Sequence, residues 1–270
     1  MTRRMRLALA VPAGAFLLLF LVWPLSGIVG EAATDGGTAF ARLAADPVFW
    51  RGISGSLVLG TVAPAVSTIV GLAVALHLAR LSPGRRAALL TVIAVPLSFS
   101  GLVVAYGFIL VFGRSGFVTL LLAEVGFDPA VVGGIIYTPA GLAFAYCYYL
   151  IPRAVLVILP VVVNFETAQI QAARALGAGP RLAFLTIVLP QVAPAMLTAF
   201  ALTAAVALGA YGTALALSGT QLPILPMVLY SKISDTGSDL PAAAAMSLVL
   251  LALAATVMAL AELVRPGRAR

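Results

Sequence analysis

One stretch of this chain, residues 171–190, combines residue types that are unusual between two long apolar runs. It has the sequence QAARALGAGPRLAFLTIVLP, with glutamine, arginine, glycine and proline close together. Its characteristic residues are Gln171-Ala172-Ala173, then Gly177 after three further residues, then Ile187-Val188-Leu189-Pro190 after nine more. None of these side chains is a nucleophile or a general base, so they offer hydrogen bonds, small surfaces and helix stops. The segment therefore predicts a docking surface for another protein outside the bilayer.

Catalytic constellations are missing from the sequence. There is one histidine, His77, and one cysteine, Cys147, and neither an HExxH motif nor a metal-ligand cluster occurs. A GxxxxGK[ST] loop that could cradle nucleotide phosphates is also missing, and no Asp or Glu lies well inside an apolar run as an ion relay would. We therefore expect a protein that is not an enzyme and holds no cofactor or metal. Any uphill transport must draw its energy from a partner.

Composition places the chain in a membrane. Hydrophobic residues make up 62% of the 270 residues and charged residues 9%, against roughly 45–50% and about 25% in soluble domains. The apolar runs do not alternate as strands would, so the predicted fold is all-α, a polytopic membrane protein with one domain over residues 1–270. The six predicted spans are Leu7–Val29, Leu57–Ala79, Ala87–Phe112, Val131 to about Val163, Pro190 to about Leu217, and Pro241–Val264.

The fourth run exceeds the length of about 20 residues that one span needs. Three prolines inside it, Pro139, Pro152 and Pro160, predict a kink, after which an apolar helix follows the cytoplasmic interface. Arg153 is then expected to anchor the cytoplasmic end of this span or to snorkel there, with substrate binding as the less favoured alternative.

The charges predict the orientation. With both termini in the cytoplasm, twelve basic residues face inward and only Arg42, Arg51, Arg114 and Lys232 face outward, a strong positive-inside bias. The net charge of +7 is therefore a topology signal, and nucleic acid is not an expected partner. The inward basic residues are Arg3, Arg4, Arg6, Arg80, Arg85, Arg86, Arg153, Arg174, Arg181, Arg265, Arg268 and Arg270.

The polar segment has a predictable local structure. Residues 166–175 can form an amphipathic helix, and Gly177 can end it by taking a positive φ just past its last turn. Pro180 prevents continuation, and the chain is expected to turn back toward Pro190, which would begin the fifth span. One helix face would be small and open to a partner backbone; it is formed by Ala168, Ala172, Ala173 and Leu176.

The spacing resembles the cytoplasmic signature of binding-protein-dependent ABC importer permeases: EAA, three residues, Gly, nine residues, then I-x-LP. Every spacing is met, and only the leading Glu is replaced, by Gln171. The flanking sequences look like those of the spermidine/putrescine-type permeases; they are Asn164-Phe165-Glu166, Gly209-Ala210-Tyr211-Gly212, Leu222-Pro223 and Val228-Leu229-Tyr230. Ala210 departs from relatives that often carry an acid at that position.

The resemblance implies a type I ABC importer permease fold with a coupling segment at about 164–190. Two copies of an ABC ATP-binding subunit, a second permease subunit, an extracytoplasmic solute-binding protein and membrane lipid would be its partners, in a bacterial cytoplasmic membrane. The residues it assigns to ATPase docking are Glu166, Gln171, Ala172, Ala173, Arg174, Gly177, Ile187, Leu189 and Pro190. Gln171 in place of Glu would keep a hydrogen bond but lose its charge-assisted part.

The solute is left open by the residues themselves. Resemblance ranks a polyamine-like cation first and ferric iron or a phosphonate next, while no residue is assigned to substrate binding. The alternative function is a secondary carrier or channel that works without an ATPase.

Overall fold

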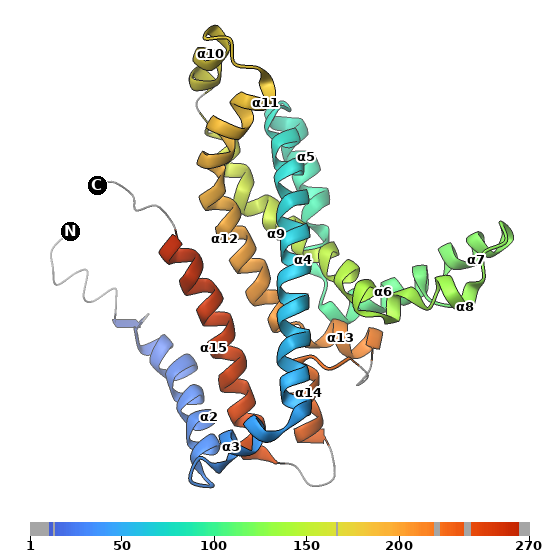
Figure 1. The fold of residues 1–270 in the computed structure, drawn as a ribbon, viewed down its shortest axis with the longest axis vertical. Coiled ribbons are helices and arrows are strands. Elements are labelled where there is room, and N and C mark those ends of the chain that lie inside the picture. The colour runs from blue at the N-terminus through green and yellow to red at the C-terminus, as the bar shows by residue number, and fades with distance from the viewer. Residues whose placement is uncertain (1–10, 13, 166, 219–221, 235–238, 265–270) are drawn as a thin grey trace.

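The computed structural model describes residues 11–264 apart from 13, 166, 219–221 and 235–238, and these residues form helices joined by short loops (Figure 1). Six described helices are long and apolar enough to cross a bilayer, which confirms the all-α fold with six spans. They cover Gly14–Ala33, Pro47–Ala79, Gly101–Glu124, Pro139–Val163, Pro180–Leu208 and Leu240–Leu263.

The individual elements follow one another in a fixed order. They are η1 (Leu18–Val22), α2 (Trp23–Ala33), α3 (Thr38–Ala45), α4 (Pro47–Ala79), α5 (Pro83–Ala94), η2 (Val95–Ser98), α6 (Gly101–Phe112), α7 (Phe117–Glu124), α8 (Pro129–Val132), η3 (Ile135–Tyr137), α9 (Pro139–Val163), α10 (Thr167–Ala175), α11 (Pro180–Ala183), η4 (Phe184–Val188), α12 (Leu189–Leu208), α13 (Tyr211–Ser218), α14 (Leu225–Ser234) and α15 (Leu240–Val264).

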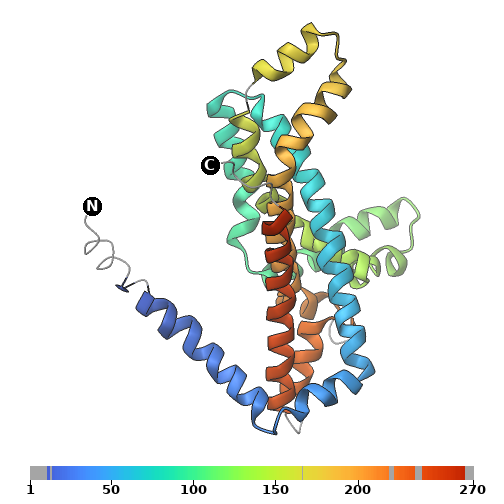
Figure 2. The same cartoon turned by 60° about the vertical axis from the view of Figure 1, so that its left-hand side comes forward.

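Helices α4, α9 and α12 pack against one another as the centre of the bundle, and α15 packs on α12 (Figures 1 and 2). Helix α2 contacts α15 but leans away from the bundle, and its apolar side chains are almost all exposed. Helices α6, α7 and α8 project to one side, whereas α10 stands at one end of the molecule, beyond the ends of α4 and α9. The core that positions α10 is therefore the α4–α9–α12 unit.

Small residues allow the central helices to approach closely. A Cβ added at Gly71 of α4 would lie 2.8 Å from the Cβ of Ala154 on α9, closer than carbon atoms can pack. Close backbone approach of this kind is typical of helix pairs in membranes. Around it lies the inner cluster, formed by Leu72, Ala75, Leu78, Ala154, Val155, Ile158, Leu159, Val188, Val192 and Ala199.

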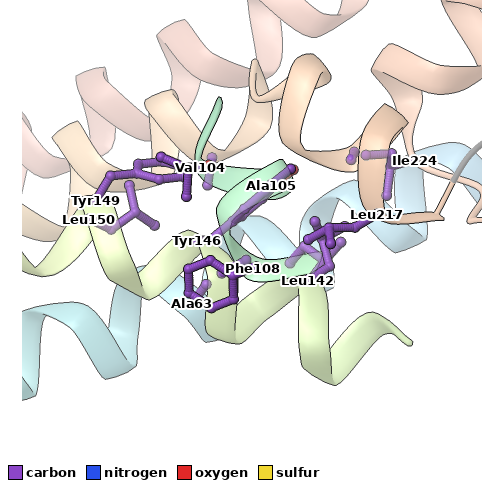
Figure 3. Packing of buried hydrophobic residues seen from close by; sticks show 14 of the residues in the cluster. Ala63, Val104, Ala105, Phe108, Leu142, Tyr146, Tyr149, Leu150, Leu217 and Ile224 are labelled. Atoms are coloured by element: carbon purple, nitrogen blue, oxygen red, sulfur yellow. The ribbon is translucent and has the colours of Figure 1, made fainter. Parts of the chain in front are cut away.

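A second buried cluster surrounds a break in the chain between α12 and α13. Tyr146 on α9 is 0% exposed, and its hydroxyl donates a hydrogen bond of 2.7 Å to the carbonyl oxygen of Ala210 inside this break (Figure 3). Phe108, Leu142 and Leu217 are among the side chains packed around the tyrosine ring. The bond connects α9 with the segment that joins α12 to α13, and it gives the Ala210 carbonyl a side-chain donor inside the bundle.

Five of the predicted spans need corrected bounds. The second begins at Pro47 instead of Leu57. Within the described residues the first long helix covers Gly14–Ala33 instead of Leu7–Val29, and residues 1–10 lie outside the described part. The third predicted span is divided, because α5 ends at Ala94 and α6 begins at Gly101 after the η2 turn that contains Pro96. The fifth long helix covers Pro180–Leu208, so it begins ten residues before Pro190 and ends at Gly209.

The fourth span also differs from the prediction. Helix α9 runs as one helix from Pro139 to Val163, with Pro152 and Pro160 inside it. The prolines do not redirect it along the interface, and Arg153 stands ten residues before Val163, about 15 Å from that end at 1.5 Å per residue. Arg153 is therefore not the helix-end anchor that the sequence predicted.

Both π-turns in the described chain end two residues before a proline. The turn Leu18–Val22 precedes Pro24, and the turn Phe184–Val188 precedes Pro190. Proline lacks an amide proton and pushes away the carbonyl four residues earlier, so one wider turn accommodates it without ending the helix. Pro190 thus lies inside the fifth span and does not begin it.

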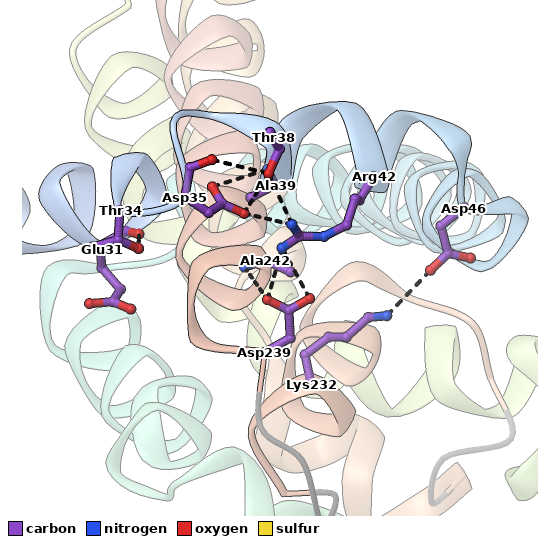
Figure 4. A network of polar contacts seen from close by, with 10 residues as sticks. All are labelled: Glu31, Thr34, Asp35, Thr38, Ala39, Arg42, Asp46, Lys232, Asp239 and Ala242. Atoms are coloured by element: carbon purple, nitrogen blue, oxygen red, sulfur yellow. Dashed lines mark hydrogen bonds and ion pairs between the residues drawn. The ribbon is translucent and has the colours of Figure 1, made fainter.

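The end of the molecule opposite α10 carries a network of ion pairs (Figure 4). Arg42 pairs with Asp35 at 2.6 Å and with Asp239 at 3.2 Å, and Lys232 pairs with Asp46 at 3.4 Å. Hydrogen bonding from Thr38, and the bond and charge of Arg42, hold the pKa of Asp35 below its usual range. The network connects the loops before α3 and α4 with α14 and the start of α15. At the other end, α10 lies with the basic residues of the α4–α5 turn and α11.

The role of the Tyr146 hydroxyl leads to a stability prediction. Tyr146→Phe removes the hydrogen bond from a buried tyrosine to the Ala210 carbonyl, which costs about 0.5–1.5 kcal/mol, so thermal unfolding in detergent should begin at a lower temperature. Tyr148→Phe is the matched control, because Tyr148 lies two residues further along α9 and is exposed. Equal unfolding temperatures for the two variants would contradict this role.

Candidate functional site

Helix α10 carries four of the nine predicted docking residues on one projecting element. Gln171, Ala172 and Arg174 are exposed, and Ala173 is half-buried. Leu176, directly after the helix, is 90% exposed, which is unusual for a large apolar side chain outside the six spans. Glu166, also predicted to take part, lies outside the described residues. We call Gln171, Ala172, Ala175 and Leu176 the coupling face.

The end of α10 has the geometry that the sequence predicted. Gly177 has a φ of +87°, and its amide donates to the carbonyl of Arg174 at 2.9 Å. The amide of Ala178 donates to the carbonyl of Ala173, also at 2.9 Å. These two bonds define a Schellman motif, in which a left-handed residue satisfies carbonyls left free at the end of a helix. Gly177 therefore fixes where α10 stops and where the chain turns.

Three apolar side chains attach α10 to the bundle. Phe165 precedes the helix, Ile170 lies within it, and Phe184 follows in η4; all three pack against the inner cluster. Beside them is a hollow of about 340 Å³, bordered also by Arg80 and Arg174. The Gln191 side chain of α12 further donates a hydrogen bond to Gln169 of α10. Helix α10 is thus held by α9 and α12 together.

The second half of the motif has a different place. Ile187 and Leu189 are half-buried in the helix that leads into α12, and Leu189 packs against the inner cluster. Pro190 is exposed but belongs to the π-turn geometry described above. The structure therefore does not bring these three residues to the coupling face; they form the stem on which α10 is mounted.

Sequence reasoning missed the residues that tether α10. Phe165, Ile170, Phe184 and Gln191 were not predicted to act, although the first three are apolar residues in an otherwise polar segment. That pattern was the available signal, because an apolar side chain in a solvent-facing segment needs a surface to pack against. Gln191 gave no comparable signal.

The sequence matches the family described as "Binding-protein-dependent transport system inner membrane component" over residues 67–270. The chain belongs to this family. It is accordingly a permease subunit of an ABC importer, a transport component without its own ATPase. Family membership implies ATPase subunits, a partner permease and a periplasmic binding protein as its associates.

Related proteins carry sulfate-transport names. "Sulfate permease 2, chloroplastic" of Chlamydomonas reinhardtii is 27% identical over 89% of this chain, which spans 64% of the length of that relative. The sulfate transport system permease protein CysW of Synechocystis sp. is also 27% identical, over 90% of this chain and 87% of the relative. A bacterial alginate ABC transporter, solved in complex with an alginate pentasaccharide-bound periplasmic protein, shares the fold with a TM-score of 0.77 and 20% identity, covering 95% of this chain and 92% of that one.

These relatives correct one prediction. Assignment to the spermidine/putrescine-type permeases, with a polyamine-like solute, is wrong, because the matching permeases are of the sulfate type. The motif at 171–190 was predicted to dock a partner protein and carries no assigned solute contact. Of the flanking sequences that suggested polyamines, residues 209–212 lie between α12 and α13 and in the first turn of α13, residues 222–223 lie in a loop, and residues 228–230 lie within α14.

The Schellman motif leads to a prediction about α10. An alanine at the φ of Gly177 is strained by about 1–2 kcal/mol, whereas asparagine tolerates this conformation. Amides of residues 167–176 should therefore exchange hydrogen faster in Gly177→Ala than in the wild type, and Gly177→Asn should restore slow exchange. Gly179→Ala is the control, since Gly179 has a φ of −67° and open space around it. Unchanged exchange in Gly177→Ala would refute the capping role.

Proposed function

We propose that this permease couples ATP hydrolysis in a partner subunit to uptake of a sulfate-like oxyanion, and that the coupling face of α10 is the docking element. The supporting observation is the 90% exposure of Leu176 at the tip of a helix whose stop and tether are both well defined. A groove on the ATP-binding subunit would cover Leu176, Ala172 and Ala175, and Gln171 would supply a hydrogen bond to it. Glu166 and Arg174 would lie at the edge of this contact.

The proposed coupling follows from the way α10 is held. Because Phe165 continues from α9 and Gln191 belongs to α12, a displacement of α10 is passed to both helices. Both contact α4 and each other through small residues, so they move as a packed unit. Closure of two ATP-binding subunits on two permeases would bring two such elements together and reopen the bundle outward.

Location and solute are part of the proposal. The charge distribution supports cytoplasmic termini and a bacterial inner membrane, with α10 on the cytoplasmic side and the Arg42 network facing the binding protein. Sulfate is favoured because relatives over about nine-tenths of the chain are named for it. It is also favoured because no Asp or Glu is found among the described residues of α4, α9 and α12, where a cation pathway would require one.

A single charge should test the docking role. Leu176→Asp places a carboxylate where an apolar contact would form, and desolvating it should weaken binding of the ATP-binding subunit at least about tenfold. Binding is measured on the detergent-purified importer by dissociation of the ATP-binding subunit, and uptake of labelled sulfate in proteoliposomes should fall in parallel. Leu176 is almost free of contacts in this chain, so membrane insertion should be unchanged.

Gly84→Asp is the control, because it adds the same charge to an exposed position in the first turn of α5, near the same end. Wild-type binding and uptake by Leu176→Asp would contradict the docking role. Sulfate accumulation by this chain alone, without ATP-binding subunits, would instead indicate a secondary carrier.

A further inference from the structure

A cavity of about 280 Å³ lies where the break between α12 and α13 faces α6 and α9. Its lining includes Tyr149 and Arg153 from α9, the segment 209–213, and Gly101 at the start of α6. It is separate from the hollow beside α10, which is lined by other residues. Its position in the middle of the bundle makes it accessible to a solute in transit and not to the ATP-binding subunit.

Arg153 brings an uncompensated positive charge to this cavity. One of its guanidinium nitrogens donates to the carbonyl of Tyr149 at 3.0 Å, and the guanidinium carbon lies 5.5 Å from the centre of the Tyr149 ring. None of the ion pairs among the described residues involves Arg153. A guanidinium has five N–H donors, so several remain for another partner. A charge at this depth is costly unless it has a function.

The Tyr149 hydroxyl is a second donor beside this cavity. Tyr149 is 6% exposed, and its hydroxyl oxygen makes no hydrogen bond of normal length. The neighbouring hydroxyl of Thr213 donates its own proton to the carbonyl of Gly101 at 3.0 Å, and its oxygen is the nearest acceptor for Tyr149. A buried hydroxyl without a close hydrogen-bond partner is uncommon in folded proteins, so this one is available to a stronger acceptor such as an anion.

Two helices begin at the same cavity. Helix α6 starts at Gly101 and α13 at Tyr211, and a Cβ added at Gly212 would lie 3.4 Å from the amide nitrogen of Leu102. The first turn of a helix leaves amide groups without intrahelical acceptors, and its dipole favours negative charge. Ser100 caps α6 through the amide of Val103, which leaves the amides nearest the cavity uncapped.

The carbonyl groups around the cavity, in contrast, already accept hydrogen bonds. The Gly101 carbonyl accepts from Thr213, and the Tyr149 carbonyl accepts from Arg153. The Ala210 carbonyl accepts from Tyr146, and the Gly209 carbonyl accepts from the amide of Tyr211 at 2.9 Å. Val206, near the end of α12, also lines the cavity, so it is the positive charge of Arg153 together with the occupied carbonyls that favours an anion over a cation here.

We propose that this cavity is a transient binding site for a tetrahedral oxyanion of the sulfate class on the translocation path. Arg153 and the Tyr149 hydroxyl bind the oxygens from α9, and first-turn amides of α6 and α13 other than those of Val103 and Tyr211 bind them from the opposite side. The inference rests on the proposed function, because it assigns a place within the permease to the solute proposed there.

The test uses the complete importer, with both permeases, the ATP-binding subunits and the binding protein in proteoliposomes, and measures labelled sulfate uptake and ATP hydrolysis together. Loss of a charge-assisted bond in Arg153→Gln should reduce uptake about tenfold or more, and loss of a neutral bond in Tyr149→Phe about fivefold. ATP hydrolysis stimulated by the loaded binding protein should stay close to the wild-type rate in both. Arg153→Lys, which keeps the charge without the planar fork, should be intermediate.

Tyr149→Phe separates a binding role from a structural one. It removes a hydroxyl that has no close hydrogen-bond partner, so the unfolding temperature should not fall even though uptake does. Tyr106→Phe is the control, because Tyr106 is exposed on α6 and does not line the cavity. If the Arg153→Gln importer does not assemble, the same uptake and hydrolysis measurements on Arg153→Lys and Tyr149→Phe test the site.

The outcomes distinguish the two proposals. If Tyr149→Phe and the assembled Arg153 variants take up sulfate as fast as the wild type, the proposed site is wrong and the proposed function still stands. A wild-type importer that takes up neither sulfate nor molybdate overturns the proposed solute and the site together. Reduced uptake with unchanged hydrolysis and unchanged unfolding supports both.

Discussion

Where a helix stops inside the bundle, the chain needs hydrogen bonds from neighbouring elements as well as its own, and here a buried tyrosine supplies one to the segment between α12 and α13. The Tyr146 hydroxyl bonds to Ala210 and holds the break between α12 and α13. Without it the apolar run of residues 189–217 could continue as a helix and satisfy its own backbone. The break gives α13 a free N-terminus, turns it toward α6 and leaves the cavity in which Arg153 lies. The interior of the bundle thus depends on a contact from α9 to a segment 64 residues away.

The same two helices connect that interior with α10. Helix α9 carries Tyr146, Tyr149 and Arg153 and leads into Phe165, while α12 begins beside Gln191 and ends at the break. A displacement at α10 therefore reaches the cavity along two rigid elements, each of about 30–40 Å at 1.5 Å per residue. The inner cluster packs α9 and α12 together, so we expect α10 and the cavity to move together.

Composition and local chemistry predicted much of this arrangement. The lengths of apolar runs predicted six spans, and Gly177 with Pro180 predicted the stop after α10, because both depend only on neighbouring residues. The break after α12 could not be predicted, since hydropathy continues across it and the bond from Tyr146 comes from a distant helix. The break after α5 had a local signal in Pro96, which a reading of hydropathy alone passes over. Arg153 was misplaced because the prolines inside α9 suggested a bend, whereas α9 runs as one helix packed against α4 and α12. The solute class was not readable from the motif at 171–190, which was predicted to contact a protein partner.

The π-turn before Pro190 has a consequence for how this segment tolerates change. Each hydrogen bond of a π-turn spans five residues, compared with four in an α-helix. A single insertion or deletion that the turn did not absorb would rotate the preceding residues by about 100° relative to α12. Leu176 would then point toward the lipid headgroups or the bundle, although the hydropathy of the segment would hardly change. The number of residues from Gly177 to Ile187 therefore sets the direction in which α10 faces. This number should vary far less than the identities of the residues within the interval.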